Sequence, residues 1–200
     1  MLNVALTGNV ASGKSTLARL FVRWGATLID SDALVADEQQ PGSETLAAIA
    51  NQFGDSMLLP DGSLDRAALR QLVFSDSDAR TALNAIVHPI IQARRERLMA
   101  EARNRGDRIV ISDIPLLFEV LDPSTFDLVV LIDSPKSLRR NRLLDRGLSG
   151  EEADQIMAAQ IPSEQKRAAA DIVIDNHGTL LELEDAAREA WKMIVARAES

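Results

Sequence analysis

The sequence predicts an α/β fold in which a five-stranded parallel sheet carries helices on both faces. Three observations predict it. Five short apolar segments look like buried strands, and segments with apolar residues at helical spacing alternate with them. A glycine-containing turn joins the first strand to the first helix, and neighbouring parallel strands require a crossover of this kind. The chain has 200 residues, about the length of one ordinary domain.

The first strand, first helix and second strand form one crossover unit. Leu2 to Thr7 is a mostly apolar run that ends at Gly8 and suits a buried parallel strand. Apolar residues recur at helical spacing from Lys14 to Trp24, and Gly25 ends this helix. Ala26 to Asp30 is the expected second strand. The remaining strands are expected at residues 108–113, 128–133 and 171–175.

A helical block, from Ser43 to about Arg105, separates the second strand from the third. Ser43 and Asp65 have the spacing of N-cap residues, whose side chains accept hydrogen bonds from the first turn of a helix. His88-Pro89 places a proline in the first turn of a helix, where its missing N–H costs nothing. Further helices are expected at about residues 135–146, 149–160 and 180–198.

Composition excludes several classes of site and partner. The chain has 22 basic and 30 acidic residues, a net charge of −8, which argues against binding to nucleic acid or to an anionic membrane. The absence of cysteine excludes disulfides, zinc–thiolate sites and cysteine nucleophiles, and two histidines are too few for a histidine-rich metal site. No apolar run is long enough to span a membrane, and the N-terminus lacks an export signal, so a cytoplasmic location is expected.

Residues Gly8 to Ser15, GNVASGKS, fit the phosphate-binding motif G-x-x-x-x-G-K-[ST] between a strand and a helix. Backbone N–H groups at such a turn, together with the helix N-terminus, favour the β-phosphate of a nucleotide. Lys14 would bridge β- and γ-phosphate oxygens, and the Ser15 hydroxyl would coordinate Mg²⁺. The alternative is a flexible glycine turn with a surface lysine. The motif predicts ATP or GTP binding by a P-loop NTPase fold, with nucleotide contacts from Gly8, Ala11, Ser12, Gly13, Lys14, Ser15 and Thr16.

Acidic residues follow two predicted strands, at the sheet edge where ligands bind in such folds. Asp32 follows the second strand and could accept the proton of an attacking hydroxyl or help hold Mg²⁺ through water. Alternatively, Ser31 or Asp32 caps the helix that starts at Ala33. Asp113 ends the third strand and matches an acidic residue that supports Mg²⁺, unless it is a turn residue before a proline.

Arg139, Arg142 and Arg146 are spaced by three and four residues, so they share one helix face. On an acidic protein this cluster is a candidate anion site, because the planar guanidinium group makes bidentate contacts with phosphate. A solvated helix face would have the same pattern, with Asp145 as a local ion-pair partner.

Two further residues have open interpretations. Leu117 lies in an apolar segment and either packs in the core or lines a substrate cleft. His88, before Pro89, either hydrogen-bonds a ligand or caps its own helix.

Motifs along almost the whole chain resemble those of the dephospho-CoA kinase family. The phosphate loop alone is shared with many families, and the ordered set of motifs is far more specific. The resemblance implies ATP-dependent phosphorylation of the 3′-hydroxyl of the ribose of dephospho-CoA, giving coenzyme A and ADP. The matching residues are Val4–Gly8, Ser12–Thr16, Ile29–Asp32, Leu83-Asn84, His88-Pro89, Asp113–Glu119, Ala159-Gln160, Lys166, Ala170-Asp171 and Val173–Gly178.

The resemblance also implies a domain organisation like that of nucleoside monophosphate kinases. The chain would be a single domain, 1–200, whose core comprises residues 1–35, 106–135 and 167–200. A helical acceptor-binding insert would occupy about 36–105, and a mobile lid about 136–166. The implied partners are ATP and dephospho-CoA, with Mg²⁺ as cofactor, no nucleic acid and no membrane. The expected oligomeric state is a monomer or a weak homo-oligomer.

Residue roles follow from the same resemblance. Asp32 matches the proposed catalytic base, and Lys14 and Ser15 match the loop lysine and the Mg²⁺ ligand. Acceptor contacts are expected from Asp32, His88 and Leu117. Arg139, Arg142 and Arg146 fall in the lid and would bind the nucleotide.

The chain departs from the family pattern at four positions. Relatives often have glycine where this chain has Asn9 and Ala11. Because a left-handed backbone at an alanine costs about 1–2 kcal/mol, we expect a negative φ at Ala11. The lid commonly has glutamine at the position of Arg139, and many relatives have arginine at that of Ile156.

Two alternative functions use the same motif. One is a kinase for another small hydroxyl acceptor, such as a nucleotide or shikimate. The other is a nucleotide-binding switch or assembly ATPase, which would hydrolyse nucleotide in response to a protein partner.

Overall fold

The structure is a computed structural model that describes the backbone of residues 1–200 and every side chain except that of Phe74. The chain divides into two compact units, one formed by residues 1–29 and 101–200 and the other by residues 30–100. No described helix combines the length and the apolar character needed to cross a membrane.

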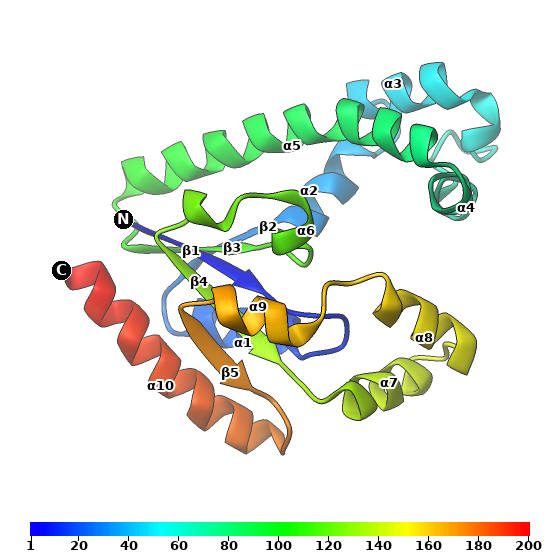
Figure 1. The fold of residues 1–200 in the computed structure, drawn as a ribbon. Coiled ribbons are helices and arrows are strands. Elements are labelled where there is room, and N and C mark those ends of the chain that lie inside the picture. Colours follow the sequence, from blue (N-terminus) through cyan, green and yellow to red (C-terminus); the bar gives the residue numbers. More distant parts are fainter. The chain divides into compact units, whose positions relative to one another are not determined.

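A five-stranded parallel sheet organises the larger unit, as predicted (Figure 1). Its strand order is β2-β3-β1-β4-β5, which places the first strand at the centre. Leu6 of β1 lies opposite Asp113 of β3 and Val130 of β4. Parallel strands end at one edge, so the segments that follow them are brought together there. The strands are β1 (Leu2–Thr7), β2 (Thr27–Asp30), β3 (Ile109–Asp113), β4 (Leu128–Asp133) and β5 (Ile172–Asp175).

Helices α1 (Lys14–Arg23) and α10 (Leu180–Glu199) pack on one face of this sheet. Their apolar stripes include Phe21 and Ile194, which are fully buried with Val4 of the central strand. The spacing of apolar residues in both helices therefore predicted the buried face correctly.

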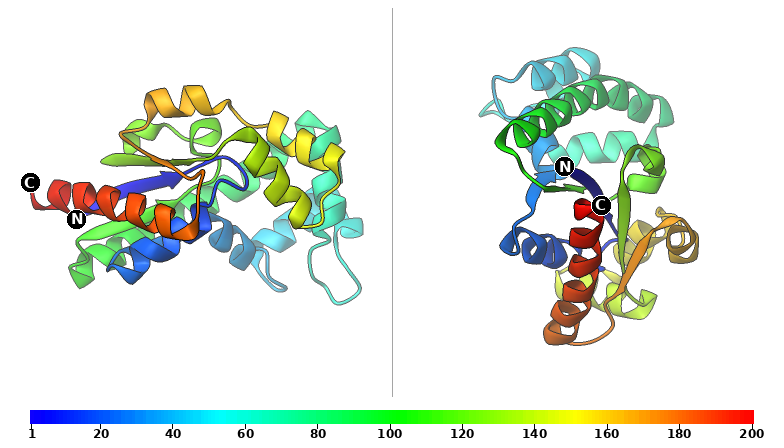
Figure 2. Two further views of the ribbon diagram at one scale, coloured as in Figure 1. Left: turned by 90° about the horizontal axis from the view of Figure 1, so that it is seen from below. Right: turned by 90° about the vertical axis from the view of Figure 1, so that its left-hand side faces the viewer.

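The opposite face is covered by α6 (Leu117–Val120) and by α9 (Ser163–Ala169), which contacts β4. The left view of Figure 2 shows α9 and α1 on opposite sides of the strands. Leu117 is fully buried here with Ala5 and Phe126. The sequence did not predict α9, because seven residues after a proline carry too little periodicity to reveal a helix.

Two helices, α7 (Lys136–Asp145) and α8 (Gly150–Ala158), follow β4. We call residues 136–158 the α7–α8 segment. Ser149 and Glu152 form a capping box at the start of α8, in which each side chain accepts a hydrogen bond from the other residue's N–H. Both helices match the predicted ranges within two residues.

The smaller unit is helical. Its core includes Leu46, Ile49 and Val87. Ser43 and Asp65 cap α3 and α4 by accepting hydrogen bonds from first-turn N–H groups, as predicted. The helices of this unit are α2 (Ser31–Glu38), α3 (Glu44–Phe53), α4 (Arg66–Ser75) and most of α5 (Ser77–Arg105), whose last residues belong to the larger unit.

The predicted cap of α2 was wrong. Neither Ser31 nor Asp32 caps a helix starting at Ala33, because α2 already begins at Ser31. Asp30 is the cap, and its Oδ1 accepts a hydrogen bond of 3.0 Å from the N–H of Ala33. Asp30 has the extended backbone of a cap residue, whereas Asp32 lies in the first helical turn.

The predicted cap at His88 was also wrong. Helix α5 runs through 29 residues with Pro89 in its interior, so His88 is a mid-helix residue. A proline inside a helix removes one backbone hydrogen bond, and the neighbouring turns can keep the helix continuous. The dipeptide pattern could not distinguish a first turn from a tolerated interior position.

We expect Pro89→Ala to stabilise the protein, because alanine supplies the N–H that Pro89 lacks. The free energy of unfolding should rise by about 1–2 kcal/mol, the cost of an interior proline less the entropy that proline removes from the unfolded chain. Urea denaturation followed by circular dichroism measures this. His88→Ala is the matched control and should change stability little. A clear loss of stability in Pro89→Ala would contradict a regular helix at this position.

Candidate functional site: a phosphate loop and its supports

The turn between β1 and α1 has the compact backbone of a phosphate loop. Gly8 is required because a Cβ at that position would lie 2.5 Å from Ile132 O. Gly13 is required because its φ is 106° and a Cβ there would clash with the side chain of Asn176. The two glycines of the motif therefore allow close approach to β4 and to the segment after β5.

The carbonyl groups of the loop are held from outside. Ala11 O accepts a hydrogen bond of 2.9 Å from Arg142 Nη1, and Ser12 O accepts one of 2.7 Å from Asn176 Nδ2. No described residue accepts a hydrogen bond from the N–H groups of Gly13, Lys14 or Ser15. Successive N–H groups with no protein acceptor at a helix N-terminus form a concavity that suits an anion.

Our expectation of a negative φ at Ala11 was wrong. Its φ is 59°, and it is the one non-glycine residue with positive φ in the described part of the chain. The side chain is buried with Leu143, Ala153 and Met157 of the α7–α8 segment. These long-range contacts offset the local cost, and the sequence did not show them.

Lys14 and Asp113 meet at the carboxyl ends of β1 and β3. Lys14 Nζ donates to Asp113 Oδ1, and the side chains are only 15% and 5% exposed. In this ion pair each side chain supplies the other's counter-charge. The structure thus brings together the predicted loop lysine and the predicted Mg²⁺-supporting carboxylate. Ser15 follows Lys14 in the sequence and has an exposed side chain in the first turn of α1.

Arg142 and Arg146 line a cavity of about 230 Å³ next to the loop. Burial lowers the pKa of Arg142, and repulsion from Arg146 adds to this effect. A cavity with two guanidinium groups beside free N–H groups suits a phosphate-bearing ligand. The cavity is lined by Ala11, Gly13, Thr16, Arg142, Arg146, Asn176, Gly178, Leu180 and Leu183.

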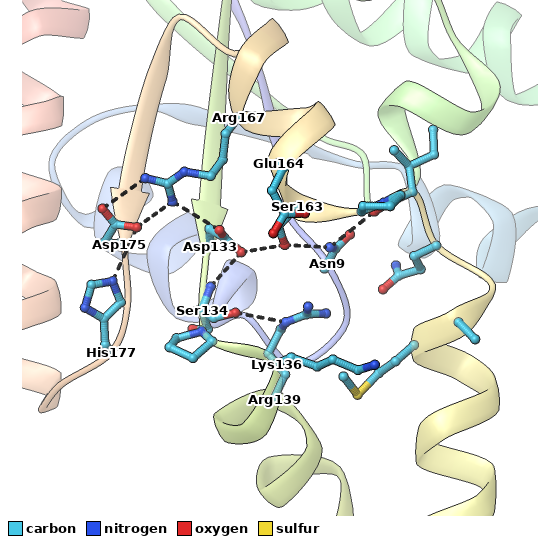
Figure 3. A pocket seen from close by; sticks show the side chains of 16 residues that line it. Asn9, Asp133, Ser134, Lys136, Arg139, Ser163, Glu164, Arg167, Asp175 and His177 are labelled. Atoms are coloured by element: carbon cyan, nitrogen blue, oxygen red, sulfur yellow. Dashed lines mark hydrogen bonds and ion pairs between the residues drawn. The ribbon is translucent and has the colours of Figure 1, made fainter.

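Arg139 lines a different cavity, of about 450 Å³ (Figure 3). Its side chain is buried, and Nε donates a hydrogen bond of 3.0 Å to Ser134 O. Burial lowers its pKa, which Asp133 and Glu164 partly oppose. Arg139 thus lines a different cavity from Arg142 and Arg146, although Arg139 and Arg142 both donate hydrogen bonds to Ser134. Nucleotide binding by all three arginines stays a prediction.

An ionic network forms another wall of this larger cavity. Arg167 donates to Asp133 at 3.1 Å and to Asp175 at 2.6 Å, which joins α9 to the ends of β4 and β5 (Figure 3). The hydrogen bond from Arg167 is the main cause of a lowered pKa at Asp175. Sequence reasoning missed this network, because its residues lie up to 42 positions apart.

Gln160 and Glu119 were recognised only as motif residues, and the structure gives each a contact. Gln160 Oε1 accepts a hydrogen bond of 2.8 Å from Val10 N in the phosphate loop. Glu119 Oε1 accepts one of 3.1 Å from Ile161 N and lies 2.7 Å from Lys166 Nζ. The Lys166 side chain is completely buried, and the pair lies outside hydrogen-bond geometry, so its attraction is Coulombic.

Three further predicted residues have different surroundings. Asp32 is exposed in the first turn of α2, and His88 is exposed within α5; both belong to the smaller unit. Leu117 is fully buried against the sheet, so core packing is the interpretation that fits, and its predicted contact with substrate does not.

Comparisons with known proteins identify the family. The family model for dephospho-CoA kinase matches residues 2–182. A dephospho-CoA kinase from Frankia casuarinae is 44% identical over 197 residues, which cover 98% of this chain and 85% of that protein. This chain belongs to the dephospho-CoA kinase family. Its members phosphorylate dephospho-CoA with ATP in the last step of coenzyme A biosynthesis, and this chain is a kinase of that type.

Solved structures agree with a kinase of P-loop fold. The crystal structure of TT1252 from Thermus thermophilus has a TM-score of 0.82 and 37% identity, with 96% of each chain covered. A shikimate kinase from Acinetobacter baumannii has a TM-score of 0.55 and 16% identity over 98% of this chain and 94% of its own, a likeness of fold alone. The architecture is thus shared with kinases of other acceptors, and the family identity rests on the sequence.

Because two cavities divide the arginines of α7, we expect them to differ in their effect on ATP. Arg142→Gln removes a cation and the hydrogen bond to Ala11 O, and should raise KM for ATP about tenfold, the loss expected for one charged hydrogen bond. Arg139→Gln, which introduces the residue common in dephospho-CoA kinases, should change this KM less than about twofold. Steady-state kinetics at saturating dephospho-CoA measures both. Equal effects would contradict the division.

We expect Lys166→Met to destabilise the protein by about 3 kcal/mol, because it leaves the Glu119 carboxylate partly buried without its counter-charge. Denaturant unfolding measures the loss. Glu119→Gln combined with Lys166→Met should recover part of it, since the neutral amide can still accept from Ile161 N. A double variant less stable than Lys166→Met would contradict this electrostatic explanation.

Proposed function

We propose that this protein transfers the γ-phosphoryl group of ATP to the 3′-hydroxyl of the ribose of dephospho-CoA. The observation that carries the proposal is the phosphate loop, whose carbonyls are held outward while its N–H groups have no protein acceptor. Beside it, Lys14 and Asp113 meet at two neighbouring strand ends. A loop of this form binds the phosphates of a nucleotide, and family membership supplies the acceptor.

In the proposed reaction the loop N–H groups hold the β-phosphate and Lys14 bridges the β- and γ-phosphates. The 3′-oxygen forms a bond to the γ-phosphorus as the bridging bond to the β-phosphate breaks, and ADP leaves. The hydroxyl proton passes to Asp32, acting as general base. Arg142 and Arg146 offset the phosphate charge. Placement and charge neutralisation supply most of the catalysis in phosphoryl transfer.

The donor set beside the loop fits Mg²⁺. Ser15 offers an exposed hydroxyl and Asp113 a carboxylate, and Mg²⁺ prefers oxygen ligands and needs few of them from protein when phosphates supply the rest. When bound, the ion would neutralise charge on the β- and γ-phosphates.

The remaining expectations extend this proposal. The helical region from about 36 to 105 would bind the acceptor, with His88 as a contact, and residues 136–166 would form a mobile lid. The protein would work in the cytoplasm as a monomer or weak homo-oligomer, without nucleic acid or membrane partners.

The decisive experiment is formation of coenzyme A by the purified protein with ATP, Mg²⁺ and dephospho-CoA, followed by chromatography of the nucleotides. A panel with shikimate and nucleoside monophosphates as acceptors tests for other kinases. We expect turnover with dephospho-CoA alone, and its loss in Lys14→Met but not in Lys192→Met, a surface lysine on α10. Hydrolysis of ATP without coenzyme A formation would overturn the proposal.

For the base, we expect Asp32→Asn to lower kcat at least a hundredfold, the usual contribution of a general base, with little change in affinity for ATP. Asp37→Asn, in an exposed position of the same helix, is the matched control and should leave kcat unchanged. Equal losses in kcat and in ATP affinity would instead assign Asp32 to nucleotide or metal binding.

A further inference from the structure

The strained alanine of the phosphate loop is the starting point. A φ of 59° at Ala11 costs an L-amino acid about 1–2 kcal/mol that glycine would not incur. Such a conformation persists only where the surrounding structure holds it in place, and it is often found at functional sites. The contacts around Ala11 should therefore show what holds it.

Those contacts come from a single stretch of chain. The methyl group of Ala11 is buried with Leu143 of α7 and with Ala153 and Met157 of α8. Ala11 O accepts from Arg142, also on α7. On the other side of the residue, Val10 N donates to Gln160, just beyond α8. The packing of the Ala11 methyl group and two hydrogen bonds thus hold Val10 and Ala11 against residues 142–160.

The direction of the loop N–H groups depends on this conformation. Ala11 and Gly13 both have positive φ, with Ser12 between them. When left-handed and right-handed backbone conformations alternate along a loop, successive N–H groups point toward one concavity. A negative φ at Ala11 would turn Ala11 O away from Arg142 and reorient the peptide that precedes Ser12. The anion-binding form of the loop therefore requires the conformation that the α7–α8 segment holds.

We propose that Ala11 is a positioning residue, whose methyl group transmits the packing of the α7–α8 segment to the phosphate loop. The inference rests on nucleotide phosphate binding at this loop, as in the proposed function. It adds that α7 and α8 set the affinity for phosphate through an apolar contact, in addition to the charges of their arginines.

The variant Ala11→Gly distinguishes this proposal from the alternative that the loop merely tolerates the strain at Ala11. If the strain is merely tolerated, Ala11→Gly removes it, and phosphate binding stays the same or improves. If the methyl group positions the loop, Ala11→Gly frees the backbone from α7 and α8, and phosphate binding weakens although the backbone conformation becomes easier to adopt.

The test is isothermal titration calorimetry of the whole protein with Mg·ADP and, separately, with AMP, which lacks the β-phosphate that the loop would hold. We expect Ala11→Gly to weaken ADP binding about fivefold while AMP binding changes less than twofold, a loss of about 1 kcal/mol confined to the loop. Met157→Ala should give the same pattern. Met157→Leu, which conserves volume, is the control for α8 and should bind ADP as the unmodified protein does.

Two further measurements complete the test. The double variant Ala11→Gly with Met157→Ala should be no weaker than either single variant, because both remove the same contact. Ala11→Ser keeps a Cβ and should retain most ADP affinity, and thermal melting checks that each variant is folded. Unchanged or tighter ADP binding in Ala11→Gly, equal losses for ADP and AMP, or additive losses in the double variant would overturn the inference. Failure of the unmodified protein to bind ADP would instead overturn the proposed function.

Discussion

The candidate site depends on one constraint. Hydrogen bonds must hold the carbonyl groups of the phosphate loop so that they point away from the concavity formed by its N–H groups. A backbone turn can present N–H groups to an anion only if its carbonyls point elsewhere and are satisfied there. Arg142, in the helix after β4, and Asn176, in the segment after β5, donate the hydrogen bonds that satisfy these carbonyls. The phosphate loop is thus a product of the central strands and the helices beyond them, as well as of its own glycines.

Polar contacts that are partly or fully buried also converge on residues 160–166. Gln160 holds Val10, Glu119 holds Ile161, and Lys166 neutralises Glu119 from within α9. Together they join the segment after β3 to the segment after α8 and to the loop. These contacts are partly or fully buried, so the loss of one partner leaves the other poorly satisfied.

Much of the fold could be predicted from patterns of short range. Apolar runs gave the five strands, helical spacing gave the buried faces of α1 and α10, and Ser43 and Asp65 marked helix starts. The errors occurred where a pattern had two solutions of similar local energy. His88-Pro89 suits a first turn or a helix interior, and Asp30, Ser31 and Asp32 can each cap a helix. Only the packing of the surrounding chain decides between such solutions.

The sequence by itself determined the class of protein, because the loop motif and the ordered family motifs depend on residue type and spacing alone. Tertiary structure decided the conformation of Ala11, the separation of Arg139 from Arg142 and the burial of Leu117. The physical reason is distance along the chain. A backbone angle at residue 11 is set by side chains at 142–160, and local preference is too weak to oppose packing of that kind.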